Sequence, residues 1–79
     1  MITTIYYSKL TSEIYTISTA PNKQDFRRFN EFEEDMKQIL DIMYIKYNEY
    51  FENTYHNYKV VNGQLVLKEG VDTINTIEE

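Results

Sequence analysis

The first twenty residues contain two runs in which β-branched and aromatic side chains predominate. Residues 2–7 read Ile-Thr-Thr-Ile-Tyr-Tyr, and residues 14–19 read Ile-Tyr-Thr-Ile-Ser-Thr. Such side chains fit the pleated, half-buried surface of a strand. The segment between the runs, Ser8 to Glu13, is short enough for a hairpin connection. The pattern therefore predicts two antiparallel strands, of which the second ends at Pro21 because proline cannot donate a ladder hydrogen bond.

After Pro21 the apolar residues change to helical spacing. Asn22 is suited to cap a helix, and neither Gly nor Pro interrupts the chain from Lys23 to Phe51. At 100° per residue, one side of this stretch is apolar and the opposite side is charged. The pattern predicts one long helix over residues 23–51. Its apolar side consists of Phe29, Phe32, Met36, Ile39, Leu40, Met43, Tyr47, Tyr50 and Phe51.

A second hairpin is indicated near the C-terminus by Asn62-Gly63 between two apolar runs. A type I′ turn needs positive φ at two successive residues, and Asn-Gly adopts it readily. Pairing across this turn sets Tyr58 against Leu67 and Val60 against Leu65, and we expect that face to be buried. Residues 71–79 contain few apolar side chains, and we expect a loosely ordered acidic tail there.

The element order predicts an α+β fold with two layers. It runs β-hairpin, long α-helix, β-hairpin (ββαββ), and one four-stranded antiparallel sheet packed on the helix would bury all the apolar faces at once. Residues 1–70 are expected to form a single domain, because 79 residues fall short of two domains of the usual minimum size.

The middle of the predicted helix is apolar almost all round. Ile42 and Ile45 project onto the otherwise charged side, and a helix of this length, about 43 Å, would overhang strands of about 20 Å. In one interpretation the helix bends near residues 48–53 so that the sheet covers these side chains. In the other they form an exposed patch that pairs with another protein or with a second copy, giving a homodimer in the latter case. The self-association patch consists of Ile42, Tyr44 and Ile45.

Composition restricts the classes of function. The chain has 13 carboxylates, 8 Lys and Arg residues and a net charge of −5, which opposes direct nucleic-acid binding. It has no cysteine, hence no thiolate nucleophile and no disulfide, as is typical of a cytoplasmic protein. The longest apolar-rich run, residues 39–47, is far shorter than the roughly 20 residues needed to cross a membrane. We therefore expect neither nucleic acid nor a membrane as a direct partner.

No residue pattern indicates catalysis, a metal site or a cofactor. His56 follows Glu52 by four residues, but a transition-metal site needs three or four ligands and the chain offers no second His and no Cys. No nucleophile motif accompanies the serines. The chain is therefore expected to be non-enzymatic.

The charged side of the predicted helix carries a row of carboxylates. The spacings Arg27–Glu31 and Glu33–Lys37 are those of ordinary i, i+4 pairs on a solvated face. Alternatively, the row presents negative charge to a basic groove, such as the nucleic-acid channel of an enzyme, and so acts as a DNA mimic. This acidic row consists of Glu31, Glu34, Asp35, Asp41, Glu49 and Glu52.

In size, acidity, absence of cysteine and hairpin-helix plan the chain resembles the small proteins by which phages and other mobile elements inhibit host enzymes, anti-CRISPR proteins among them. The resemblance implies a viral protein that binds a larger host protein in the host cytoplasm, for example a CRISPR nuclease or another nucleic-acid enzyme. The alternative is a homodimeric structural or regulatory module assembled through the apolar patch.

Overall fold

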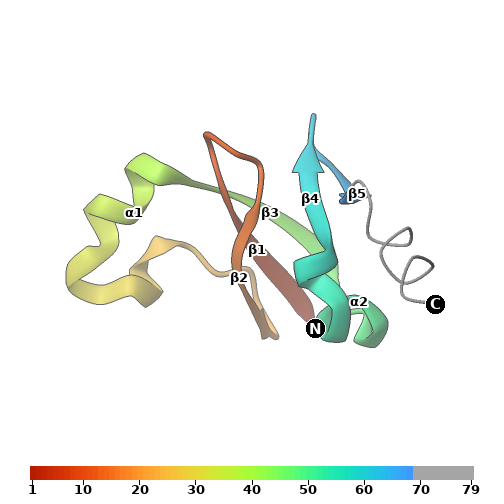
Figure 1. Cartoon of the computed structure of the whole chain (residues 1–79). Helices are drawn as coiled ribbons and strands as arrows, with labels where there is room; N and C mark the ends of the chain where they lie inside the picture. The colour runs from red at the N-terminus through yellow and green to blue at the C-terminus, as the bar shows by residue number, and fades with distance from the viewer. Residues whose placement is uncertain (69–79) are drawn as a thin grey trace.

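Three antiparallel strands form the main sheet, as seen in a computed structural model that describes residues 1–68 (Figure 1). They are β1 (Ile2–Ser8), β2 (Ile14–Ala20) and β3 (Leu40–Lys46), in the order β2-β1-β3. The central strand β1 pairs Ile5 with Ile17 on one side and with Met43 on the other. Two α-helices accompany the strands in this part of the chain, so the protein has a small α+β fold with an antiparallel sheet.

The N-terminal hairpin is confirmed. β2 ends at Ala20, directly before Pro21, as the loss of a ladder donor requires. The connection contains neither Gly nor Asn, and the Ser8 hydroxyl holds it instead by accepting hydrogen bonds from the N–H groups of Leu10 and Thr11. Ser12 supplies the positive φ, 69°, that reverses the chain. Side-chain capping thus replaces the usual turn residues.

The prediction of a single long helix over residues 23–51 is wrong. That stretch is divided into a 3₁₀ helix η1 (Phe26–Phe32), helix α1 (Glu33–Ile39), strand β3 and helix α2 (Glu49–Thr54), which is followed by a 3₁₀ turn η2 (Tyr55–Asn57). Asn22 begins no helix. Asp25 instead caps η1 by accepting from the Arg27 N–H, and Asn48 caps α2 by accepting from the Phe51 N–H, at 2.9 Å in both cases.

The error has a physical cause in the apolar segment that becomes β3. Short apolar runs give the same periodicity signal for a buried helix and a strand covered on both faces. In the sheet, Met43 and Ile45 belong to one face, whereas Ile42 and Tyr44 belong to the other. The side chains that made a helix apolar all round are therefore accommodated by a strand, and pairing with β1 decides between the two structures.

One face of the sheet is covered by α2 and by the C-terminal hairpin. Ile5, Phe51 and Val60 form the buried centre, with exposed fractions of 0, 5 and 3%. Half-buried apolar side chains pack around them: Tyr7, Ile14, Ile17, Met43, Ile45, Tyr55, Tyr58 and Leu65.

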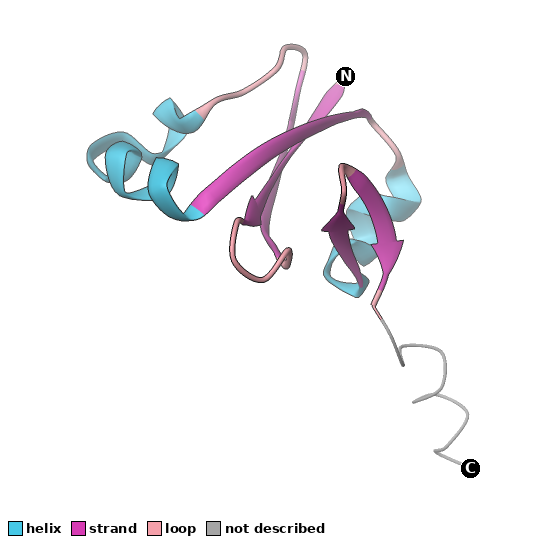
Figure 2. Ribbon diagram, turned by 90° about the horizontal axis from the view of Figure 1, so that it is seen from above, coloured by secondary structure: helices cyan, strands magenta, loops and turns pink. Residues whose placement is uncertain are grey.

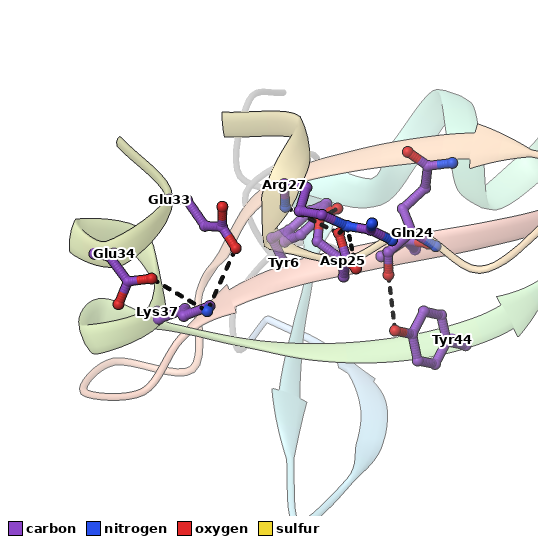
Figure 3. A network of polar contacts seen from close by, with 9 residues as sticks. Tyr6, Gln24, Asp25, Arg27, Glu33, Glu34, Lys37 and Tyr44 are labelled. Atoms are coloured by element: carbon purple, nitrogen blue, oxygen red, sulfur yellow. Dashed lines mark hydrogen bonds and ion pairs between the residues drawn. The ribbon is translucent and has the colours of Figure 1, made fainter. Parts of the chain in front are cut away.

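The opposite face is covered by the chain between β2 and α1. The buried ring of Tyr6 meets Phe26 and Phe29 edge to face, with centroids 5.9 and 5.1 Å apart. The Tyr6 hydroxyl donates to the Asp25 carbonyl at 2.7 Å (Figure 3). The Gln24 N–H donates to the Thr4 hydroxyl at 3.1 Å. Residues 24–29 are thus fixed on the sheet by aromatic contacts and by main-chain hydrogen bonds.

The C-terminal hairpin is also confirmed, as β4 (Tyr58–Val61) and β5 (Gln64–Leu67). Tyr58 pairs with Leu67 and Val60 with Leu65, and the turn residues Asn62 and Gly63 have φ values of 52° and 77°. Val60 is buried, whereas Leu67, predicted on the same buried face, is half exposed.

The predicted four-stranded sheet is wrong, because β4 and β5 form a separate two-stranded sheet. The second edge of β1, to which another hairpin could have been added, is occupied by β3. The hairpin instead meets the start of β2, through a bridge between Glu13 and Lys59 and a hydrogen bond from the Val60 N–H to the Ser12 carbonyl, 2.9 Å. The predicted tail, residues 71–79, lies outside the described residues.

Replacing Tyr6 by Phe should lower the free energy of unfolding by about 1 kcal/mol at neutral pH, measured by urea denaturation followed by circular dichroism. The variant keeps the ring contacts and loses only the hydrogen bond to the Asp25 carbonyl. The control is Tyr15→Phe, since the Tyr15 side chain is half exposed. Equal stability of the two variants would mean that the Tyr6 hydroxyl contributes nothing.

The same variant should change the response to alkali. Burial raises the pKa of the Tyr6 hydroxyl, and the nearby Arg28 guanidinium offsets this only in part. The folded protein therefore retains the proton at a pH where tyrosine in the unfolded chain ionises, above about 10. Wild-type stability should fall as the pH rises through this range, and it should fall less steeply in Tyr6→Phe.

Replacing Asn48 by Ala should cost about 1 kcal/mol of stability in the same urea assay, because α2 loses the side chain that caps its first turn. That turn carries Phe51 into the core. Asn53→Ala, an exposed change inside the same helix, should leave stability unchanged or raise it slightly. A loss in both variants would indicate a general weakness of α2 rather than a capping effect.

Candidate functional site

The six carboxylates of the acidic row do not share one helix. Glu31 lies in η1, Glu34 and Asp35 in α1, Asp41 in β3, and Glu49 and Glu52 in α2. Figure 2 shows α1 and α2 at opposite ends of β3, and seven strand residues span about 23 Å. The row is therefore divided into a group around α1 and a group on α2, with Asp41 between them.

The group around α1 keeps its carboxylates in water. Glu31, Glu34 and Asp35 are exposed. The Lys37 ammonium lies 3.4 Å from a Glu33 oxygen and 3.3 Å from a Glu34 oxygen (Figure 3). Hydrogen bonds to Glu34 and Glu33 raise the pKa of Lys37. The predicted Glu33–Lys37 pair is thus confirmed, with Glu34 as a second partner.

The two arginines near this group are engaged elsewhere. The Arg27 Nε lies 2.9 Å from an Asp25 oxygen, so the predicted Arg27–Glu31 pair does not form. The Arg27 backbone N–H, and then its side chain, hold the pKa of the Asp25 carboxyl below its usual range. The Arg28 guanidinium lies over the Tyr6 ring, 5.4 Å from its centroid. Within residues 1–68, Glu31 and Asp35 therefore form no ion pair.

Two of the remaining carboxylates of the row make contacts within the fold. The Asp41 Oδ1 accepts a hydrogen bond from the Ile42 N–H at 2.9 Å. Burial raises the pKa of Tyr7, and the adjacent Asp41 carboxylate adds to this shift. Glu52 accepts a hydrogen bond from the Thr19 hydroxyl, which also lies 3.0 Å from the Thr3 hydroxyl. Asp41 and Glu52 are thus tied to the sheet.

Glu49 lies at the start of α2, next to exposed tyrosines. Burial raises the pKa of Tyr47, and the negative charges of Glu52 and Glu49 raise it further. Tyr47 and Tyr50 are 44 and 70% exposed. Among the described residues, the α2 end thus combines the Glu49 carboxylate, which has no ion pair there, with exposed aromatic side chains.

The predicted self-association patch is not a single surface. Ile42 and Tyr44 lie on the face covered by residues 23–29, whereas Ile45 packs against the core on the other face. The Tyr44 hydroxyl donates to the Gln24 carbonyl at 2.8 Å, and the Lys23 ammonium lies 5.0 Å from the ring centroid. The mid-helix patch is therefore wrong, because these residues belong to a strand whose side chains alternate between faces.

The feature that the helical interpretation missed is the outer edge of β3. This strand is the last in the order β2-β1-β3, so only its inner edge is paired with β1. The signal was present in the sequence, since β-branched and aromatic residues make up much of Leu40–Lys46. Strand edges of this kind offer main-chain donors and acceptors to another polypeptide.

Similarity assigns no function to this chain. Comparison with protein-family models, with curated proteins and with solved structures finds no match. Within residues 1–68 no group of three His, Asp or Glu side chains is placed to hold a metal ion, and no pocket is formed. No helix in that part of the chain is long and apolar enough to span a membrane. His56 is exposed and contacts the Tyr55 ring edge to face.

Replacing Glu52 by Ala should lower the free energy of unfolding by about 1 to 2 kcal/mol, because Thr19 then loses a charged acceptor in a half-buried place. Glu49→Ala, on the same helix and exposed, should change stability by less than about 0.5 kcal/mol. Thermal and urea denaturation of both variants would show the difference. Similar values for the two would mean that Glu52, like Glu49, is merely solvated.

Proposed function

We propose that this chain is a non-enzymatic protein-binding module that inhibits a host nucleic-acid-handling enzyme, in the manner of the anti-CRISPR proteins of phages. It would do so by placing the carboxylates around α1 on a basic surface that otherwise receives nucleic acid. The contact residues are Glu31, Glu34 and Asp35, with Glu31 and Asp35 foremost. A CRISPR nuclease is the partner of first choice, because its nucleic-acid channel is positively charged.

One observation carries this proposal: the cationic side chains around α1 are already occupied. Lys37 binds Glu33 and Glu34, and Arg27 binds Asp25. Arg28 lies over aromatic rings, and the Lys9 ammonium donates to the Lys37 carbonyl at 2.9 Å. A basic partner would therefore meet Glu31 and Asp35 without first releasing them from an ion pair, whereas Glu34 is shared with Lys37. Complementary charge of this kind accelerates association and weakens as ionic strength rises.

The charge distribution favours a local contact rather than mimicry along the whole molecule. Residues 1–68 contain nine carboxylates and eight Lys and Arg side chains, so they are almost neutral together. Residues 31–37 contain four carboxylates and one lysine. Four of the five excess negative charges of the chain are in residues 69–79, which contain four carboxylates and no cationic side chain. The acidic contact is therefore expected to cover only the α1 end of the described surface.

The double reversal Glu31→Lys/Asp35→Lys should abolish salt-sensitive binding to the partner. The immobilised chain is used to capture proteins from a bacterial lysate at low and high salt, and a captured nuclease is then assayed for inhibition of DNA cleavage. We expect retention at about 50 mM salt, loss at about 500 mM, and at least about a tenfold weaker inhibition by the variant.

The matched control is Glu13→Lys/Glu49→Lys, which changes the net charge equally at sites away from α1. Within residues 1–68 the Glu13 carboxylate pairs with Lys68 alone, in a surface ion pair of small energetic value. Inhibition by the control should equal that of the wild type. If both double variants lost inhibition equally, the effect would come from overall charge and not from the α1 contact. Undiminished inhibition by Glu31→Lys/Asp35→Lys would refute the α1 contact.

A further inference from the structure

We propose that two copies of this chain pair antiparallel along the outer edges of β3, so that two three-stranded sheets become one sheet of six strands. This surface is independent of the α1 carboxylates through which the proposed inhibition would act. The partner is thus a second copy of the chain, related by a two-fold axis that passes close to Met43. The argument rests on which main-chain groups of β3 are hydrogen-bonded to β1 and on the residues at its outer edge.

The hydrogen-bond phase shows which residues of β3 face outward. The Lys9 N–H donates to the Ile39 carbonyl at 2.9 Å, and the Tyr47 N–H donates to the Met1 carbonyl at 3.1 Å. In an antiparallel pair the bonded residues alternate, so the odd-numbered residues of β3 direct their main-chain groups to β1. The main-chain groups that point away from β1 belong to Leu40, Ile42, Tyr44 and Lys46.

Two of these outward N–H groups are available to a partner. The Leu40 N–H donates to the Met36 carbonyl at the end of α1. The Ile42 N–H is held by the carboxylate of its neighbour Asp41. Within residues 1–68 the N–H groups of Tyr44 and Lys46 have no hydrogen-bond acceptor. An edge of this length with free donors is the kind of surface on which strands are added.

A two-fold axis at Met43 gives a self-complementary register. Ile42 then lies opposite the partner's Tyr44, and Leu40 lies opposite the partner's Lys46. The free N–H groups of Tyr44 and Lys46 would thus donate to the outward carbonyls of the partner's Ile42 and Leu40. The same register sets Ile39, 53% exposed, opposite the partner's Tyr47, 44% exposed. Pairs of a β-branched and an aromatic side chain are favourable across neighbouring strands. Each copy would thus cover exposed apolar side chains of the other at both ends of β3.

The experiment measures mass and amide exchange over a concentration series. Light scattering should give a monomer at low micromolar concentration and a dimer as the concentration rises. Hydrogen exchange followed by NMR should show the amides of Tyr44 and Lys46 becoming protected as the dimer forms, whereas those of Met43 and Ile45 are protected at every concentration. A monomeric mass up to about 500 µM, where even a weak complex would form, would overturn the proposal. A dimer in which Tyr44 and Lys46 still exchange fast would also overturn it.

Discussion

The rest of the fold depends on the burial of β1 on both faces. Thr3, Thr4, Ile5 and Tyr6 are four consecutive residues with at most 1% of their surface exposed. Because successive side chains of a strand point to opposite faces, one cover cannot bury them all. α2 and the C-terminal hairpin cover Ile5, and residues 24–29 cover Tyr6. Both edges of β1 must also be paired, which β2 and β3 do. A single long helix could have satisfied only one of these four requirements.

The parts of the fold that could be predicted are those that neighbouring residues determine. The first hairpin, the end of β2 before Pro21 and the turn at Asn62-Gly63 depend on local conformational preference, and they are confirmed. The identity of β3 depends instead on a partner more than thirty residues earlier in the chain. Helical spacing could not reveal that partner, and the nine-residue apolar run was compatible with either structure.

The prediction of the candidate site failed for the same reason, because it also depended on contacts between residues far apart in the sequence. The acidic row was defined by helical spacing over residues 31–52, and once β3 replaces the middle of that helix, only residues close in sequence remain together in space. Glu31, Glu34 and Asp35 stay grouped, whereas Glu52 is bound by Thr19 and Asp41 by the Ile42 N–H. The edge of β3 could not be inferred at all without the strand itself. The sequence therefore identified the carboxylates, but it could not predict which of them lie together in space.

The pairing of β1 with β3 also has a consequence for folding during synthesis. Ile2 is paired with Lys46, so the central strand obtains its second neighbour only after most of the chain has been made. At roughly 5 to 20 residues per second, the finished N-terminal hairpin waits a few seconds with one edge of β1 open. Closing so long a loop is also slow, because its entropy is lost before the contacts form. During synthesis β1, the most deeply buried strand of residues 1–68, therefore keeps one edge unpaired until β3 has been made. In that interval the hairpin depends on the turn that the Ser8 hydroxyl stabilises.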